Sequence, residues 1–107
     1  MNMKRIVLFF LTIMFASIAF AEATWIDVRS AEEYGEDHIN GDINISYEQI
    51  VPQVKKLFPD KNTELHLYCK SGRRAGIAMS RLQEAGYTNI TNAGGIDDAR
   101  VERKIHK

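Results

Sequence analysis

The sequence contains a single cysteine and no excess of charge of either sign. One cysteine excludes an internal disulfide framework and a cysteine-rich zinc site. The 14 basic and 14 acidic residues cancel to a formal net charge of zero. Without an overall basic field, the composition argues against nucleic acid or an anionic membrane surface as a partner. A length of 107 residues also excludes two ordinary domains.

The amino-terminal segment differs in composition from the rest of the chain. Two basic residues precede an uncharged, mainly apolar run over residues 6–20, and an A-x-A pattern ends at Ala21. This arrangement is typical of a secretory signal peptide. The run is shorter than the ~20 apolar residues that a membrane-spanning helix needs. Residues 1–21 are therefore predicted to be a cleaved signal peptide, with cleavage after Ala23 and an uncleaved anchor as the alternatives.

Residues 22–107 are predicted to form a single domain that works outside the cytoplasm. No stable association with the membrane is expected once the signal peptide has been cleaved. The one cysteine of this domain would then lie in a compartment where thiols tend to be oxidised.

Hydrophobic periodicity predicts strands that alternate with helices along this domain. Strands are predicted at residues 25–28, 42–45, 64–68 and 89–91, and helices at 30–34, 46–58, 75–85 and 96–104. Ser30 and Glu33 fit a capping box at the start of the first helix, and Gly35 is predicted to end it. Pro52 either kinks the second helix or lies in the first turn of a new one. The alternation predicts an α/β fold with a mostly parallel central sheet flanked by helices.

Only one segment demands a chemical explanation, and it begins at Cys69. The cysteine is predicted at the carboxyl end of a strand, followed by a polar loop over residues 70–74 and then by a helix. Open parallel sheets bind ligands at that end of their strands. The free N–H groups and the dipole of a helix amino terminus favour anions and lower the pKa of a thiol. A buried cysteine that acts only as a small hydrophobic side chain is the alternative.

The residues of the loop favour the reactive alternative. Lys70, Arg73 and Arg74 add positive charge, although paired arginines can also form a merely solvated face. Gly72 allows the loop to curl so that several N–H groups face inward. A thiolate stabilised in this way is a nucleophile. Farther along the chain, residues 92–95 are predicted to form a tight loop whose glycine pair shapes the backbone near the rim of the pocket.

Three motifs give the sequence a family resemblance. Residues 68–75 read Y-C-K-S-G-R-R-A and resemble the active-site loop of rhodanese-like sulfurtransferases, C-x-x-G-x-R followed by a small residue. Residues 25–45 resemble the family's opening D-V-R…E-[FY]…H-I-x-G-x-I-N, and residues 86–95 its closing strand and glycine pair. The order of the motifs is also that of the family. Among its members, the chain is most similar to the single-domain periplasmic type.

The resemblance implies a small rhodanese-like domain and a sulfur-transfer reaction. Cys69 would be the catalytic residue, and the residues that bind the anionic substrate would be Lys70, Ser71, Gly72, Arg73 and Arg74. The implied donor is a small anion such as thiosulfate, the acceptor is cyanide or a thiol, and neither a metal nor an organic cofactor is needed. A persulfide sulfur carrier and a thiol-redox interaction module, each with little turnover, remain the alternatives.

Other features refine these expectations. Rhodanese-fold phosphatases carry one more residue between the cysteine and the arginine, so the four residues between Cys69 and Arg74 favour sulfur over phosphoryl chemistry. Asp27 and Arg29 are expected to bond to each other rather than to take part in catalysis. Ala99 stands where many relatives carry a tryptophan, which predicts a more open pocket.

Overall fold

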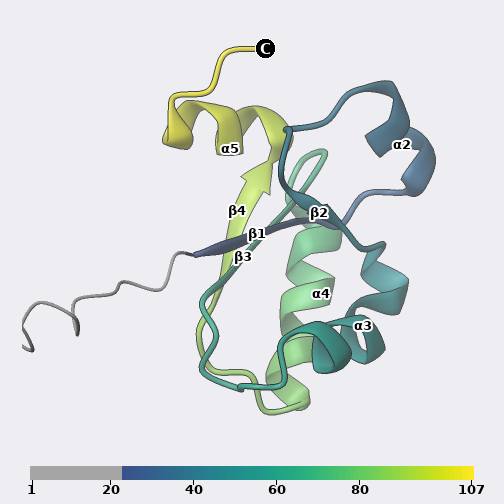
Figure 1. The fold of residues 1–107 in the computed structure, drawn as a ribbon, viewed down its shortest axis with the longest axis vertical. Coiled ribbons are helices and arrows are strands. Elements are labelled where there is room, and N and C mark those ends of the chain that lie inside the picture. Colours follow the sequence, from purple (N-terminus) through teal and green to yellow (C-terminus); the bar gives the residue numbers. More distant parts are fainter. Residues whose placement is uncertain (1–22) are drawn as a thin grey trace, which may run out of the picture.

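A computed structural model of the chain describes residues 23–107 (Figure 1). Its elements are, in chain order, β1 (Thr24–Asp27), α2 (Ala31–Glu36), β2 (Ile43–Asn44), the 3-10 helix η1 (Tyr47–Gln49), α3 (Ile50–Leu57), β3 (Leu65–Cys69), α4 (Arg73–Glu84), β4 (Ile90–Gly95) and α5 (Ile96–Arg103). The predicted signal peptide, residues 1–21, lies outside the described residues. Within residues 23–107, no helix has the length and the apolar character needed to cross a membrane.

The four strands form one sheet in the order β2-β1-β3-β4, and all neighbouring strands are parallel. The predicted α/β fold with flanking helices is therefore confirmed. Because every strand runs in the same direction, the carboxyl ends of all four meet at one edge. Cys69 ends β3 at this edge and pairs with Gly95, the last residue of β4.

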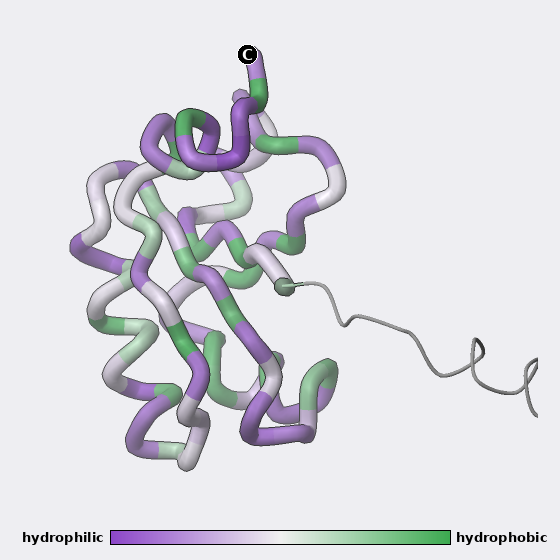
Figure 2. The backbone as a smooth tube through the Cα atoms, turned by 90° about the vertical axis from the view of Figure 1, so that its left-hand side faces the viewer, coloured by the Kyte–Doolittle hydropathy of each residue, from purple (hydrophilic) through white to green (hydrophobic). Residues whose placement is uncertain are grey.

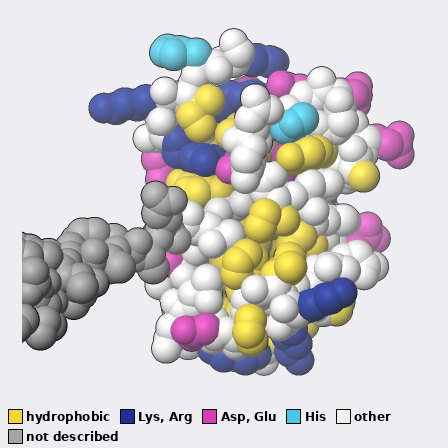
Figure 3. All heavy atoms as spheres, in the orientation of Figure 1, with side chains coloured by type: hydrophobic (Ala, Val, Ile, Leu, Met, Phe, Trp, Pro, Cys, Tyr) yellow, Lys and Arg dark blue, Asp and Glu magenta, His cyan; other side chains and the backbone are white. Residues whose placement is uncertain are grey.

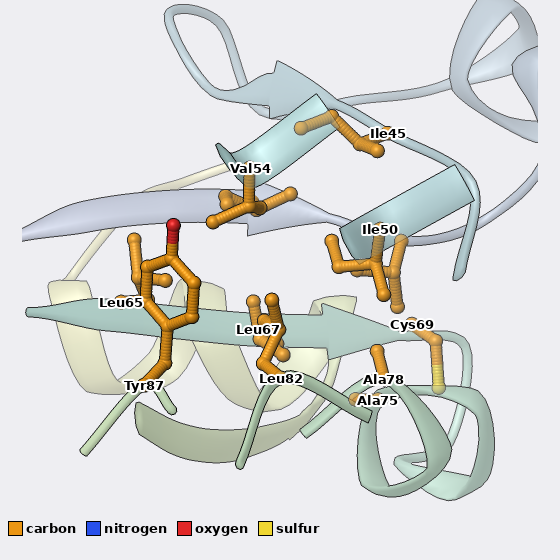
Figure 4. Packing of buried hydrophobic residues seen from close by; sticks show 12 residues of the cluster. Ile45, Ile50, Val54, Leu65, Leu67, Cys69, Ala75, Ala78, Leu82 and Tyr87 are labelled. Carbon is orange, nitrogen blue, oxygen red and sulfur yellow. The ribbon is translucent and has the colours of Figure 1, made fainter. Parts of the chain in front are cut away.

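Alternation along β3 sends its side chains to two different cores. Leu65, Leu67 and Cys69 face the larger core, which α3 and α4 cover (Figure 4). Tyr68 points to the opposite face, into a smaller cluster with Ile39, Ile96 and Ala99. Figure 2 shows hydrophobic and hydrophilic residues following one another along the strands. The sheet thus has a helix-covered face on each side, and Cys69 lies on the α4 side.

Pro52 is accommodated because the chain divides its helical segment in two. Residues 47–49 form the separate turn η1, and α3 starts afresh at Ile50. Pro52 then lies in the first turn of α3, where a backbone N–H has no partner within the helix. Of the two alternatives for this proline, the structure shows the second.

The first helix is capped as predicted but ends later than predicted. The Ser30 hydroxyl accepts the Glu33 N–H at 3.1 Å, and the Glu33 carboxylate accepts the Ser30 N–H at 3.0 Å. The prediction that Gly35 ends α2 is wrong, since the helix continues to Glu36. Gly35 is exposed there, and a helical glycine costs only about 1 kcal/mol relative to alanine.

The predictions for the boundaries around the glycine pair and the cysteine loop need correction. Residues 92–95 are not a tight loop but the second half of β4, which follows β3 with a register shift between Leu67 and Cys69. Pairing with a neighbouring strand overrides the low strand propensity of N-A-G-G. The polar loop is also shorter than predicted, because α4 begins at Arg73 and only residues 70–72 remain outside helix and strand.

Candidate active site

Cys69 lies where β3 turns into α4, and its sulfur faces the amino terminus of that helix. Gly72 precedes α4 with a left-handed backbone, φ 99°, which glycine adopts without strain. Its N–H donates to the Cys69 Sγ at 2.9 Å. In Figure 4 the cysteine side chain lies beside Ala75, in the first turn of α4. The three-residue loop therefore curls around the sulfur atom, as an anion-binding nest does.

The pKa of the Cys69 thiol is lowered by this backbone arrangement. Burial opposes the lowering, because the residue is only 1% exposed and a charged sulfur loses hydration there. Hydrogen bonds from backbone N–H groups stabilise the thiolate, and their combined effect on the pKa exceeds that of burial. The N–H groups are those of Ala75, Ser71, Gly72 and Arg74. Backbone N–H groups at the start of α4 thus favour the thiolate form of this buried cysteine.

The lowered pKa should be visible in the reactivity of the protein toward an alkylating agent. Cys69 is the only cysteine, so iodoacetamide consumption reports on this thiol alone. We expect the rate to reach half of its plateau at a pH below the ~8.5 of an ordinary thiol. Intact mass recorded at timed intervals over a range of pH values measures it. A midpoint at or above that of a small-molecule thiol run alongside would contradict the backbone stabilisation.

Arg74 is held by a partner 41 residues earlier in the chain. Its guanidinium donates to both carboxylate oxygens of Glu33, at 2.7 and 3.0 Å. The hydrogen bond from Arg74 is the main reason why the pKa of Glu33 falls to about 2. Since Glu33 also caps α2, the ion pair fastens the first turn of α4 to the first turn of α2. The predicted role of Arg74 in binding the substrate anion stays a prediction.

The Glu33–Arg74 ion pair should stabilise the fold in a pH-dependent way. The folded-state pKa of Glu33 is about 2, below its ordinary 4.5. The stabilisation is therefore complete above about pH 5 and is lost as the pH falls toward 2. At pH 7 we expect Glu33→Gln to lower the free energy of unfolding by about 1–2 kcal/mol. The difference from the wild type should shrink between about pH 5 and pH 2.

Urea unfolding at several pH values measures this difference. Glu84→Gln is the matched control, because Glu84 is exposed at the far end of α4 and forms no ion pair among the described residues. If the free energy of unfolding of Glu33→Gln stays below that of the wild type by the same amount from pH 7 to about pH 2, the carboxylate does not contribute through its charge.

The other predicted binding residues follow Cys69 directly, with Lys70, Ser71 and Gly72 in the loop and Arg73 as the first residue of α4. Lys70, Ser71 and Arg73 are exposed, and Gly72 is partly exposed. Within residues 23–107, neither Lys70 nor Arg73 forms an ion pair, so both cations are available to an approaching anion. The structure thus places all five predicted binding residues in the loop after Cys69 and in the first turn of α4. In the same part of the chain, no group of three or more His, Cys, Asp or Glu residues is placed to hold a metal ion.

A support behind the loop was only partly foreseen from the sequence. The Asn92 side chain donates to the Gly72 carbonyl oxygen at 2.9 Å and accepts the Gly94 N–H at 2.9 Å. At Gly95 the backbone passes so close to Lys70 that a Cβ would collide with the Lys70 carbonyl. The glycine pair therefore shapes the backbone as predicted, whereas nothing in the sequence singled out Asn92.

The structure also shows the positions of Asp27, Arg29 and Ala99. Asp27 is fully buried and receives hydrogen bonds from the Arg29 backbone and guanidinium at 2.8–3.1 Å, which confirms their internal pairing. Ala99 is fully buried in the smaller cluster and does not line the pocket beside the loop. The expectation that this alanine opens the pocket is wrong, because its side chain points into the core under α5.

Comparison with known proteins identifies the family. The sequence model of the rhodanese-like domain matches residues 16–100. The chain belongs to the rhodanese-like family. A solved structure described as a rhodanese with anions from E. coli superimposes on this rhodanese-like chain with a TM-score of 0.68 at 42% identity, covering 72% of this chain and 91% of that one. The predicted resemblance and the predicted rhodanese-like fold are confirmed.

Two proteins that are similar in sequence to this rhodanese-like chain have names that give them different roles. Thiosulfate sulfurtransferase PspE of Escherichia coli (strain K12) is 41% identical over 93 residues, which cover 87% of this chain and 89% of that protein. The putative sulfur carrier protein YrkF of Bacillus subtilis (strain 168) is 31% identical over 67 residues, which cover 63% of this chain and 35% of that protein.

Proposed function

We propose that this chain is a thiosulfate sulfurtransferase that carries sulfur as a persulfide on Cys69. The observation that supports this most directly is the loop around the Cys69 sulfur, where the Gly72 N–H donates to Sγ at 2.9 Å and further backbone N–H groups lower the pKa of the thiol. They stabilise a thiolate, and they can equally hold the negative charge of a persulfide. The similarity to PspE over most of both chains supports thiosulfate as the donor.

The first half of the reaction loads the enzyme. The Cys69 thiolate attacks the outer sulfur of thiosulfate, and a bond forms between these two sulfur atoms. The sulfur–sulfur bond within thiosulfate breaks, and its electron pair leaves with sulfite. The backbone N–H groups of the loop retain the persulfide anion that remains. In the second half, cyanide or a thiol takes the outer sulfur and restores the thiolate.

This mechanism requires two separate chemical steps, which steady-state kinetics can reveal. With thiosulfate and cyanide as substrates, we expect double-reciprocal plots of the rate of thiocyanate formation to give parallel lines. Lines that intersect would show that both substrates bind before either reacts, and would overturn the persulfide route.

Lys70 and Arg73 should attract the donor dianion. Both are exposed and free of ion pairs among the described residues, so each replacement removes one positive charge near the loop. We expect Lys70→Met and Arg73→Met each to raise the KM for thiosulfate about three- to tenfold at low salt, and less at high salt. Lys55→Met, an exposed lysine on α3, is the control of equal charge change. A KM unaltered in both loop variants would refute their part in binding.

A sulfur carrier with little turnover is the second candidate function. The similarity to the putative sulfur carrier YrkF favours it, as does the near-complete burial of Cys69. Such a protein would load one sulfur from thiosulfate but form thiocyanate at a rate close to the background. The rate of the second half-reaction therefore distinguishes the two functions, whereas the first half-reaction is common to both.

The periplasm is the proposed location, on the basis of the amino-terminal sequence. The basic start, the apolar run and the A-x-A pattern over residues 1–21 support export and cleavage. Fractionation of cells that express the full chain, followed by intact mass, tests it. We expect a shortened protein in the periplasmic fraction; the full-length chain in the cytosol would contradict the proposal.

A further inference from the structure

The carbonyl of Gly72 is the point at which the active loop is tied to β4. It accepts the Gly76 N–H at 3.0 Å, in the first turn of α4, and the side-chain amide of Asn92 at 2.9 Å. A carbonyl oxygen has two lone pairs, so these two donors satisfy it fully. The N–H of Gly72 donates to the Cys69 Sγ at 2.9 Å. Gly72 is therefore held at its carbonyl, while its N–H holds the sulfur.

The active loop and the end of β4 pack directly against each other. A Cβ at Gly72 would lie 3.3 Å from the Gly94 Cα. A Cβ at Gly95 would collide with the Lys70 carbonyl. The Asn92 side chain crosses this contact, because its nitrogen donates to Gly72 and its oxygen accepts the Gly94 N–H at 2.9 Å. Asn92 thus fastens the loop to the strand where their backbones touch.

The backbone of Gly72 needs such a contact. Its left-handed φ of 99° suits glycine, but glycine adopts other backbone conformations about as readily. The residue can therefore turn its N–H away from the sulfur unless the surrounding fold holds it. Asn92 is well placed to do so, because it is paired with Leu67 of β3 and is itself fixed in the sheet.

Asn92 differs from the predicted binding residues in two ways. It carries no charge, and it lies on β4 and not in the segment that follows Cys69. Figure 3 shows acidic side chains over α2 and basic side chains over α5, so charge on this part of the surface comes from other residues. A neutral amide does not attract the donor dianion from a distance. Any effect of Asn92 on the reaction must therefore act through the position of the loop.

We propose that Asn92 is a positioning residue, whose side chain holds Gly72 so that the Gly72 N–H stays directed at the Cys69 sulfur in both the thiolate and the persulfide. Only the part that concerns the persulfide rests on the proposed function. Asn92 is exposed, so water can satisfy the Gly72 carbonyl and the Gly94 N–H when the amide is removed, but water does not fix their positions. The fold should survive that loss, whereas the loop should lose its alignment.

The pH dependence of Cys69 alkylation tests the part that concerns the thiolate. Asn92→Leu keeps the approximate size of the side chain without its hydrogen bonds, and Asn92→Ala removes both size and hydrogen bonds. Neither variant changes the charge. With iodoacetamide, we expect the midpoint of the alkylation rate to rise by about 0.5–1 pH unit in both, because a hydrogen bond to the thiolate is weakened.

Asn89→Ala is the matched control. The Asn89 side chain is also exposed, and it donates to the Asn62 carbonyl at 3.3 Å. It lies just before β4, at the end of that strand away from the active loop. The control thus removes one exposed asparagine and one hydrogen bond without touching the loop. Its alkylation midpoint should equal that of the wild type.

Single-turnover loading with thiosulfate tests the part that concerns the persulfide. At saturating thiosulfate, we expect both Asn92 variants to gain sulfur about five- to twentyfold more slowly than the wild type, because the Gly72 N–H is displaced and not removed. The thiosulfate concentration that gives half of this rate should change less than about twofold. Lys70→Met should show the opposite pattern, since it removes a charge that attracts the donor. Rates are divided by the folded fraction, which urea unfolding measures.

The results separate a positioning role from a merely structural one. A wild-type alkylation midpoint in either folded variant would overturn the proposal, even if that variant were less stable. A raised midpoint with unaltered loading kinetics would overturn the part that concerns the persulfide. If the wild type gains no sulfur but the midpoint still rises in the variants, the proposed function fails and the positioning of the thiolate is supported.

Discussion

Replacing Cys69 by alanine should abolish thiosulfate-dependent thiocyanate formation while the fold survives. The backbone N–H groups of the loop remain in the variant, but no atom is left that can accept the sulfur. We expect activity to fall by more than about a thousandfold, as when other enzymes lose a covalent nucleophile. Stability should change by only about 1 kcal/mol, because the side chain lost from the core is small.

Thiocyanate formation and thermal unfolding, measured on the same preparation, separate the two effects. A variant that melts close to the wild type but lacks activity supports the assignment of Cys69. Activity retained in a folded Cys69→Ala protein would require a different sulfur acceptor in a chain that has no second cysteine.

Gly95→Ala should be the most damaging single methyl group that can be added near the site. Its Cβ would collide with the Lys70 carbonyl oxygen and lie 3.0 Å from the carbonyl carbon, and both atoms are backbone. The chain must shift either β4 or the active loop. We expect a loss of about 3 kcal/mol in the free energy of unfolding. In the protein that stays folded, a displaced loop should reduce activity about a hundredfold.

Gly35→Ala provides the matched control for this substitution. A Cβ at Gly35 meets nothing within 4 Å, and the residue is exposed inside α2. The added methyl group should raise the free energy of unfolding by about 0.5–1 kcal/mol and leave sulfur transfer unchanged. Equal stability and activity for Gly95→Ala and the wild type would show that the close approach of β4 to the loop is not needed.

Local patterns in the sequence were sufficient to predict that Cys69 lies between a strand and a helix. Alternating apolar residues before Cys69 predicted β3, and helical spacing after it predicted α4, so the cysteine had to lie at a strand end before a helix. The capping box at Ser30 was also readable, since its two partners are three residues apart. These features depend on neighbours in the sequence, which is why they could be predicted.

Features that depend on distant contacts could not be predicted in the same way. The ion pair of Arg74 joins residues 41 positions apart, and no local pattern reveals that Glu33 is its partner. The extension of β4 to Gly95 comes from pairing with β3 and overrides its own low strand propensity. Similarly, only the packing of α5 shows that Ala99 points into the core and away from the pocket.

The most direct test of the account is the intact mass of the protein before and after treatment with thiosulfate. We expect the wild type to gain the mass of one sulfur atom and to lose it again on addition of cyanide, whereas Cys69→Ala should gain nothing. A wild-type protein that gains no sulfur, or an equal gain in Cys69→Ala, would contradict the claim that Cys69 carries the sulfur.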